Sequence, residues 1–174
     1  MNLREILSVR IGRREISAIC SSCMSSTDYS LREDLFSLID DSDNRTGYNA
    51  LWILTHLSVY ETKWLKSKRD ILIDRLLGET HTGKRRLILT LLEALDTEES
   101  DVRTDYLDFC LSRINSVEPY GVRALCLKQA YAQCKFYPEL LQELKAEIEM
   151  MDSGVMSPGI VSARKNILKR ILKQ

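Results

Sequence analysis

The chain has 174 residues, a formal net charge of zero and 44% hydrophobic residues, a balance that favours a folded domain with a core over a disordered chain. Only seven glycines and three prolines occur, so intrinsic propensity favours helices. The longest stretch without Asp, Glu, Lys or Arg, residues 46–60, is too short to span a bilayer as a helix, and the first residues lack the basic-then-apolar layout of a secretory signal. We therefore expect a cytoplasmic protein without a membrane segment.

A glycine followed by an apolar helical run recurs along the chain. The intervals between these glycines are 35, 36, 38 and 38 residues, and the glycines are Gly12, Gly47, Gly83, Gly121 and Gly159. After each of them, apolar residues recur at helical spacing. We expect these helices, in chain order, within residues 12–25, 44–59, 81–95, 119–136 and 157–174.

A second set of helical patterns lies between these segments. Apolar residues at spacings of three, four and seven predict helices within residues 31–39, 64–76, 106–114 and 140–148. The unit is therefore a helix pair of about 36 residues, which cannot bury both faces alone and must stack on its neighbours as an α-solenoid. We expect one domain over residues 1–174, with repeats at about 1–25 (a cap), 28–59, 61–95, 98–136 and 138–172.

Several short runs resemble the ordered landmarks of a family of short bacterial HEAT-like repeat proteins of the armadillo type. These runs are Asn49–Leu54, Tyr106–Leu111, Gly121–Ala124, Tyr131–Leu140, Ser157–Gly159 and Arg164–Lys169. The resemblance covers most of the chain and is strongest from residue 101 onward. It implies an all-α, right-handed α-α superhelix of about five helix pairs, and it implies no established catalytic residues.

The stretch from Gly78 to Arg85 reads GETHTGKR and is one residue short of a phosphate-binding loop. Such a loop needs a strand before it and a Ser or Thr after the lysine, whereas a helical pattern precedes Gly78 and Arg85 follows Lys84. The repeat explains Gly83 without a nucleotide. We predict no cofactor.

The other chemical motifs are equally incomplete. Cys20 and Cys23 have C-x-x-C spacing but no second pair of ligands, so buried core thiols are expected rather than zinc or redox chemistry. The acids from Glu98 to Asp101 are interpreted as a helix start, where the macrodipole favours them. We predict a protein that is not an enzyme; a hydrolase or lyase would require a pocket of convergent polar groups.

Charge separates between the two sets of helices. The five segments that follow the glycines carry +1, +1, +2, +3 and +5 in chain order, whereas residues 28–43, 96–118 and 137–152 carry −5, −5 and −4. In HEAT-like superhelices the second helix of each pair lines the concave surface, so the resemblance implies a basic groove. Its expected residues are Arg85, Arg86, Arg123, Lys128, Arg164, Lys165, Lys169 and Lys173.

Two kinds of partner fit such a groove. The leading hypothesis is a protein-interaction scaffold that binds another protein, with an acidic segment as the attracted feature. The alternative is nucleic acid bound through its phosphates on the same face. Trp52 and Trp64 lie on apolar helical stripes and are expected in the core rather than in the groove. A third interpretation leaves the basic helices as solvated faces that pair with the acidic helices of each repeat.

Overall fold

The structure is a computed structural model that describes residues 2–27, 29–57, 59–151 and 156–173. Within these ranges, eleven α-helices and two short 3₁₀ helices follow one another, and no strand occurs. The all-α class predicted from the sequence is confirmed. The chain forms two compact units, residues 1–69 (the first unit) and 70–174 (the second unit). No described helix is long and apolar enough to cross a membrane.

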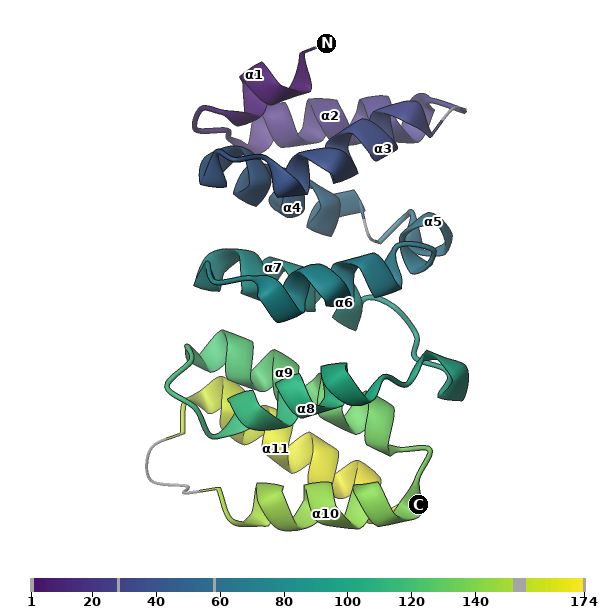
Figure 1. Cartoon of the computed structure of the whole chain (residues 1–174), viewed down its shortest axis with the longest axis vertical. Coiled ribbons are helices and arrows are strands. Elements are labelled where there is room, and N and C mark those ends of the chain that lie inside the picture. Colours follow the sequence, from purple (N-terminus) through teal and green to yellow (C-terminus); the bar gives the residue numbers. More distant parts are fainter. Residues whose placement is uncertain (1, 28, 58, 152–155, 174) are drawn as a thin grey trace. The chain divides into compact units, whose positions relative to one another are not determined.

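The first unit is organised around one central helix, α4. Its elements are α1 (Leu3–Leu7), α2 (Arg13–Ser25), α3 (Ser30–Ser37), η1 (Leu38–Asp40), α4 (Asn44–Leu57) and α5 (Thr62–Lys66). Helix α4 packs against α1, α2, α3 and η1 (Figure 1). Its buried side chains include Ala50, Leu51, Ile53 and Leu54, which lie on neighbouring turns and so form one apolar face.

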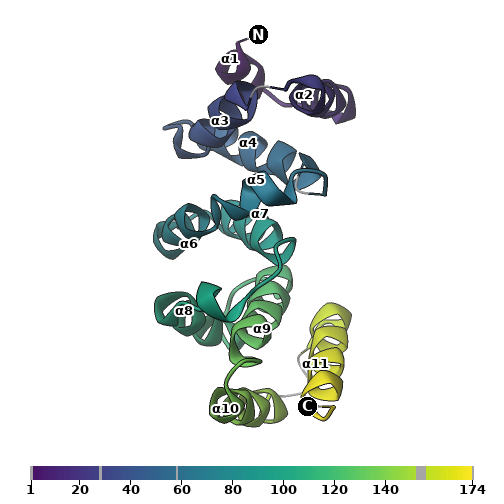
Figure 2. The ribbon, with the colours of Figure 1, turned by 90° about the vertical axis from the view of Figure 1, so that its right-hand side faces the viewer.

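The second unit consists of three helix pairs in two layers. Its elements are α6 (Arg69–Gly78, which begins one residue before the unit), α7 (Thr82–Glu93), η2 (Glu99–Asp101), α8 (Thr104–Ile114), α9 (Tyr120–Cys134), α10 (Pro138–Glu149) and α11 (Pro158–Ile171). In Figure 2 the first helices of the pairs, α6, α8 and α10, form one layer, and the second helices, α7, α9 and α11, form the other. Helix α9 packs against α7, α8, α10 and α11 and is the centre of this unit.

The repeated glycines lie at or near the starts of second helices. Gly12 is the N-cap of α2, and Gly83, Gly121 and Gly159 are the second residues of α7, α9 and α11. No described glycine has a positive φ, so unusual backbone geometry does not explain them. At Gly121 a side chain would meet a neighbouring helix, because its Cβ would lie 3.6 Å from Cδ of Arg86. This is an ordinary van der Waals distance, so Arg86 lies beside the start of α9 without requiring a glycine there.

The pattern over residues 64–76 was expected to form one helix and instead forms two, α5 and α6. At the end of α5, the backbone N–H groups of Ser67 and Lys68 donate to Trp64 O (3.1 Å) and Leu65 O (2.9 Å), a tighter winding than the α-helix. The hydroxyl of Ser67 also donates to Trp64 O (2.6 Å). Trp64 itself is buried, as expected, and its indole N–H donates to Glu33 Oε1 (2.9 Å). This contact with α3 fixes α5, and a new helix begins at Arg69.

The acids at residues 98–101 do not start an α-helix. They form the 3₁₀ helix η2, in which the side chain of Asp101 accepts from the backbone N–H of Glu98 (2.9 Å). Helix α8 begins only at Thr104, after the extended residue Arg103. The acids thus lie at a helix start, as interpreted, but the helix is a short 3₁₀ helix, and a local capping contact accounts for them.

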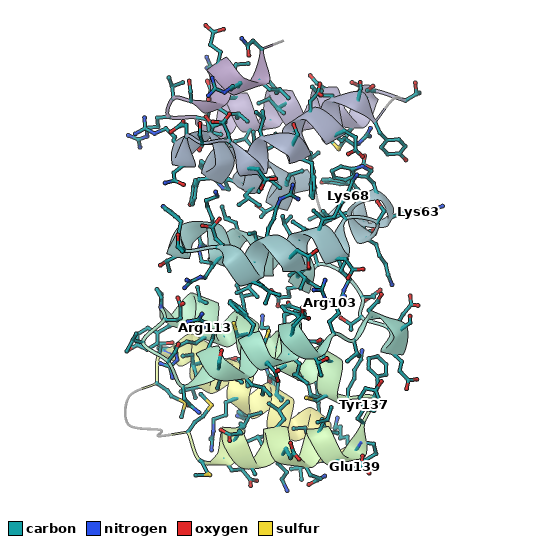
Figure 3. The ribbon with its side chains drawn as sticks, in the orientation of Figure 1. Lys63, Lys68, Arg103, Arg113, Tyr137 and Glu139 are labelled. Carbon is teal, nitrogen blue, oxygen red and sulfur yellow. The ribbon has the colours of Figure 1, made fainter. Side chains whose placement is uncertain are left out.

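Arg103, labelled in Figure 3, links helices of the second unit. Its Nη2 contacts Asp74 Oδ1 of α6 (2.8 Å) and Asp105 Oδ2 of α8 (2.7 Å), and its backbone N–H donates to Gln133 Oε1 of α9 (3.2 Å). The hydrogen bond from Arg103 lowers the pKa of Asp105 below its usual value. Because the carboxylates are exposed, these contacts set the register between neighbouring pairs more than they add stability.

One buried amide joins the first two helix pairs of the first unit. Asn49 of α4 is buried, and its Nδ2 donates to the carbonyls of Leu7 (2.8 Å) and Val9 (2.9 Å). These carbonyls belong to the end of α1 and to the connection between α1 and α2. The amide therefore satisfies carbonyls that the short helix α1 leaves unpaired.

We predict that Asn49→Ala lowers the free energy of unfolding by about 1–3 kcal/mol, because two hydrogen bonds to buried or half-buried carbonyls are lost. Urea unfolding followed by circular dichroism measures the change. The control is Asn166→Ala, at an exposed position inside α11, which should change the stability by less than about 0.5 kcal/mol or raise it slightly. Equal losses in the two variants would contradict this role of Asn49.

Candidate functional site

The basic residues predicted to edge a groove lie in two kinds of environment. Arg85, Arg123 and Arg164 are half-buried, whereas Arg86, Lys128, Lys165, Lys169 and Lys173 are exposed. The half-buried side chains bind other parts of the repeat, and the exposed ones lie at its surface, where Lys128 pairs with Glu93.

The half-buried arginines bind the ends of first helices. Their Nε atoms donate to backbone carbonyls: Arg85 to Glu79 O (2.7 Å), Arg123 to Ile114 O (2.8 Å) and Arg164 to Ile148 O (2.9 Å). The last carbonyls of a helix have no partner within it and carry the negative end of its dipole. Each arginine therefore joins the second helix of a pair to the end of its first helix.

Arg85 also takes part in an ion-pair cluster. Its Nη1 pairs with Glu118 of the turn between α8 and α9, and Arg113 Nη1 lies 3.6 Å from the same carboxylate oxygen. The side chain of Glu118 is almost completely buried, so its charge requires such partners. Arg85 thereby links the pair α6–α7 to the pair α8–α9.

The GETHTGKR stretch is the turn that joins α6 to α7. His81 is the N-cap of α7, and its Nδ1 accepts from the backbone N–H of Lys84 (3.3 Å). Lys84 is buried, and its Nζ lies 3.3 Å from Glu79 Oε2. The lysine that would hold a phosphate is thus occupied by a carboxylate of the same turn, and a helix rather than a strand precedes the stretch.

A hollow of about 440 Å³ lies between the end of α7 and the helices α9 and α11. We call it the second-helix hollow. Its charged and polar lining consists of Glu93, Asp96, Thr97, Lys128, Gln129, Tyr131, Lys135, Asn166 and Arg170. Lys128 Nζ pairs with Glu93, so part of this charge is neutralised within the hollow. The hollow presents both signs of charge, with three cations against two carboxylates.

Two cations of the hollow lie over aromatic rings. Lys135 Nζ lies 4.9 Å from the ring centre of Phe136, and the guanidinium of Arg170 lies 5.9 Å from that of Tyr131. No described carboxylate pairs with either of them. An aromatic face holds a cation in place without neutralising it, so both charges remain available to an anion. Lys135 and Arg170 are not among the predicted groove residues, although both lie in the positively charged segments 119–136 and 157–174.

Two lysines of α11 and a third just after its end form a separate feature. Lys165, Lys169 and Lys173 follow one another at intervals of four residues, which places them along one side of the helical path. The buried residues of α11, Ile160, Ala163, Ile167 and Ile171, lie on its opposite side. We call these lysines the α11 lysine stripe. Arg170 and Asn166 lie between the stripe and the buried side, where they line the hollow.

Trp52 departs from its expected place. It is half-buried rather than in the core, and it lines a depression of the first unit. Trp64, by contrast, packs edge-on against Phe36 with ring centres 6.0 Å apart. The difference could not be read from hydrophobic spacing, because both tryptophans lie on apolar stripes.

The thiols are set up for packing rather than for reactivity. Cys23, Cys110, Cys126 and Cys134 are buried, and Cys20 is half-buried. Burial raises the pKa of Cys23 to about 11 and that of Cys134 to about 11, because the thiolate is poorly solvated there. Within the described residues, no group of three or more His, Cys, Asp and Glu side chains could hold a metal ion.

Comparison with protein families identifies the kind of repeat. The chain matches the HEAT repeat domain over residues 3–171, which is almost its whole length. The likeness to HEAT-like repeat proteins seen in the sequence is therefore confirmed. Searches of curated proteins and of solved structures find no match.

We predict that Arg123→Met lowers the free energy of unfolding by about 1–2 kcal/mol, because the bond to Ile114 O and the charge at the end of α8 are lost while the aliphatic stem is kept. Lys165→Met removes an exposed cation of the α11 lysine stripe and should change the stability by less than about 0.5 kcal/mol. The shift of the urea midpoint measures both effects. If the two variants were equally stable, Arg123 would be an ordinary surface charge and not a link within the repeat.

Proposed function

Because the chain belongs to the HEAT repeat family, whose repeats usually mediate protein interactions, we propose that it is a non-catalytic scaffold whose second unit binds an acidic segment of a partner protein. The observation that carries the proposal is the set of cations at the end of α9, along α11 and just after α11 that have no described carboxylate partner. These are Lys135 and Arg170 at the second-helix hollow and Lys165, Lys169 and Lys173 of the α11 lysine stripe.

The distribution of charge supports an acidic partner. Residues 157–174 carry +5, whereas the preceding segment, residues 137–152, carries −4. The acids on α10 and the cations on α11 could have neutralised one another, but among the described residues the ion pair formed by α10 joins Lys145 to Glu149 within that helix. The cations of α11 are therefore left to attract an external anion.

The shape and lining of the second-helix hollow favour specific binding of side chains over general electrostatic attraction. Its volume of about 440 Å³ accommodates one or two side chains, and Tyr131, Asn166 and Gln129 supply aromatic and amide groups beside the cations. In the same lining, Asp96 and the pairing of Glu93 with Lys128 reduce the attraction of a continuous polyanion at this point. A protein segment that alternates acidic with polar or apolar side chains fits this mixture better than a uniform phosphate backbone does.

Nucleic acid is the alternative partner of the same cations. Phosphate contacts would give affinity for unrelated duplexes that falls steeply with salt. An acidic peptide makes fewer ionic contacts, and its binding should depend on salt less steeply.

We predict that the full chain binds a fluorescein-labelled peptide of about 12 residues with alternating Glu and Leu, and binds the matching Gln–Leu peptide at least about fivefold more weakly, as measured by fluorescence anisotropy. The double variant Lys135→Gln/Arg170→Gln should weaken binding of the Glu–Leu peptide about three- to tenfold, since each partly exposed ion pair contributes about 0.2–1 kcal/mol. Adding Lys165→Gln, Lys169→Gln and Lys173→Gln should weaken it further.

The matched control is Arg13→Gln/Lys63→Gln, which removes two exposed cations of the first unit and the same total charge. It should change the affinity less than about twofold. Equal losses in the two double variants would show a general charge effect and contradict the site. Tighter binding of a 20-base-pair duplex than of the peptide, with a steep salt dependence that Lys135→Gln/Arg170→Gln flattens, would replace the protein partner with nucleic acid.

A further inference from the structure

The first unit contains a depression on its surface that is separate from the second-helix hollow. Its volume is about 500 Å³, and we call it the first-unit hollow. Its lining consists of Arg10, Ile11, Gly12, Arg45, Tyr48, Asn49 and Trp52. It lies where the connection between α1 and α2 meets α4, and these elements are adjacent in Figure 2.

One face of α4 forms most of the lining. Arg45, Tyr48, Asn49 and Trp52 are separated by three, four and seven residues, so they lie along the same side of the helix. Asn49 holds the opposite wall in place through its bonds to the carbonyls of Leu7 (2.8 Å) and Val9 (2.9 Å). Because Arg10 directly follows Val9, this buried amide fixes the backbone that carries the second arginine. The hollow is thus built by the packing of the unit and is not a chance gap between loops.

The arginines of the hollow have no carboxylate partner among the described residues. Both Arg10 and Arg45 are exposed, and no acid lines the hollow. The acids nearest in sequence cap helices instead: Glu15 accepts from the backbone N–H of Gly12 (2.8 Å), and Asp43 accepts from Thr46 N (3.1 Å) and Thr46 Oγ1 (2.8 Å). Two guanidinium groups at one depression favour an oxyanion, which each can bind through two parallel hydrogen bonds.

The aromatic side chains of the hollow indicate a second property of its ligand. Trp52 and Tyr48 are half-buried, so parts of both rings face the hollow. The ring centre of Trp52 lies 6.2 Å from that of His56, one turn further along α4. A large ring that is left partly open beside a cation is suited to a flat or apolar group next to the anion.

The distribution of charge on α2 and α4 favours a ligand with one anionic group over a chain of phosphates. After Glu15, helix α2 contains no charged residue, and α4 contains none except Arg45. The other cations of these two helices are Arg13 and Arg14 at the start of α2, and none follows them along either helix. A nucleic acid strand needs cations that continue along its phosphates, and this short group does not extend along α2 or α4. A peptide with one acidic side chain next to an aromatic or apolar one needs only the cations that are present.

We propose that the first-unit hollow binds an extended peptide through one oxyanion, either the carboxylate of Asp or Glu or the phosphate of a phosphorylated residue, with the neighbouring aromatic or apolar side chain against Trp52 and Tyr48. The inference extends the scaffold function to a second recognition site, and it does not depend on the second-helix hollow. The two sources of oxyanion share the same chemistry and are separated by experiment.

The test follows the indole N–H signal of Trp52 in ¹H–¹⁵N spectra of the full chain. The chain has two tryptophans, so Trp52→Phe assigns the two signals. Three acetylated peptide amides of about four residues serve as probes and contain Glu-Tyr, phosphoserine-Tyr or Gln-Tyr. We expect the Trp52 signal to shift saturably with the Glu or phosphoserine peptide and not with the Gln peptide, while the Trp64 signal stays in place. Whichever of the Glu and phosphoserine peptides binds more tightly identifies the source of the oxyanion.

Two variants make the assignment specific. Arg45→Gln and Arg10→Gln should each weaken binding about tenfold or more, because a charged hydrogen bond is lost. Arg13→Gln, one exposed arginine outside the lining, should leave the affinity within about twofold, and so should Lys135→Gln/Arg170→Gln in the second unit. An unchanged Trp64 signal in each variant shows that the fold of the first unit is kept.

Several results would overturn the inference. These are no shift of the Trp52 signal at millimolar peptide, equal shifts with the Glu and Gln peptides, or equal weakening by Arg13→Gln and Arg45→Gln. Tighter binding of ATP or of a short oligonucleotide than of either acidic peptide, lost in Arg45→Gln, would also exclude a peptide ligand. Because Lys135→Gln/Arg170→Gln affects only the second-helix hollow, failure at one site is distinguishable from failure at the other.

Discussion

Each unit depends on one helix that must bury apolar side chains against several neighbours. In the second unit this helix is α9, which contacts both helices of its layer and two first helices. Burial of Val122, Cys126, Leu127 and Ala130 removes most of its sides from water, and each large apolar side chain contributes about 1.5–3 kcal/mol. Charged residues of α9 are therefore restricted to the few positions that burial leaves open. The available positions, more than the number of lysines and arginines, decide where a partner can be bound.

Closure of each helix pair uses part of the positive charge. Arg85, Arg123 and Arg164 bind carbonyls at the ends of first helices, and Lys84 pairs with Glu79 within one turn. These contacts follow from the geometry of a pair, in which the end of one helix and the start of the next lie close together and leave carbonyls unpaired. A net charge counted along a second helix consequently overstates the charge that a partner meets.

The sequence predicts the helices better than it predicts the site. Glycine period and apolar spacing place the second helices of the second unit close to their observed bounds, as for residues 119–136 and the observed Tyr120–Cys134. The break between α5 and α6 was missed because the apolar spacing continues across it, and the contact of Trp64 with Glu33 is a tertiary one. For the same reason the role of Arg123 was missed: residue type gives its charge, but only the folded pair gives the distance from its Nε to Ile114 O.

Tryptophan 52 shows how local packing turns a core pattern into a recognition surface. Its stripe on α4 would be covered if the connection between α1 and α2 lay flat on the helix, but Asn49 holds this connection by its carbonyls at Leu7 and Val9. Arg10 follows directly and is exposed, so the wall next to the ring is cationic rather than apolar. A ligand that carries both an anion and an apolar group can contact the ring and the unpaired guanidinium groups at the same time. It should bind more tightly than a ligand with only one of these groups, because each contact excludes water from the other. Asn49, a buried amide in the lining of the hollow, thereby positions the backbone that carries Arg10.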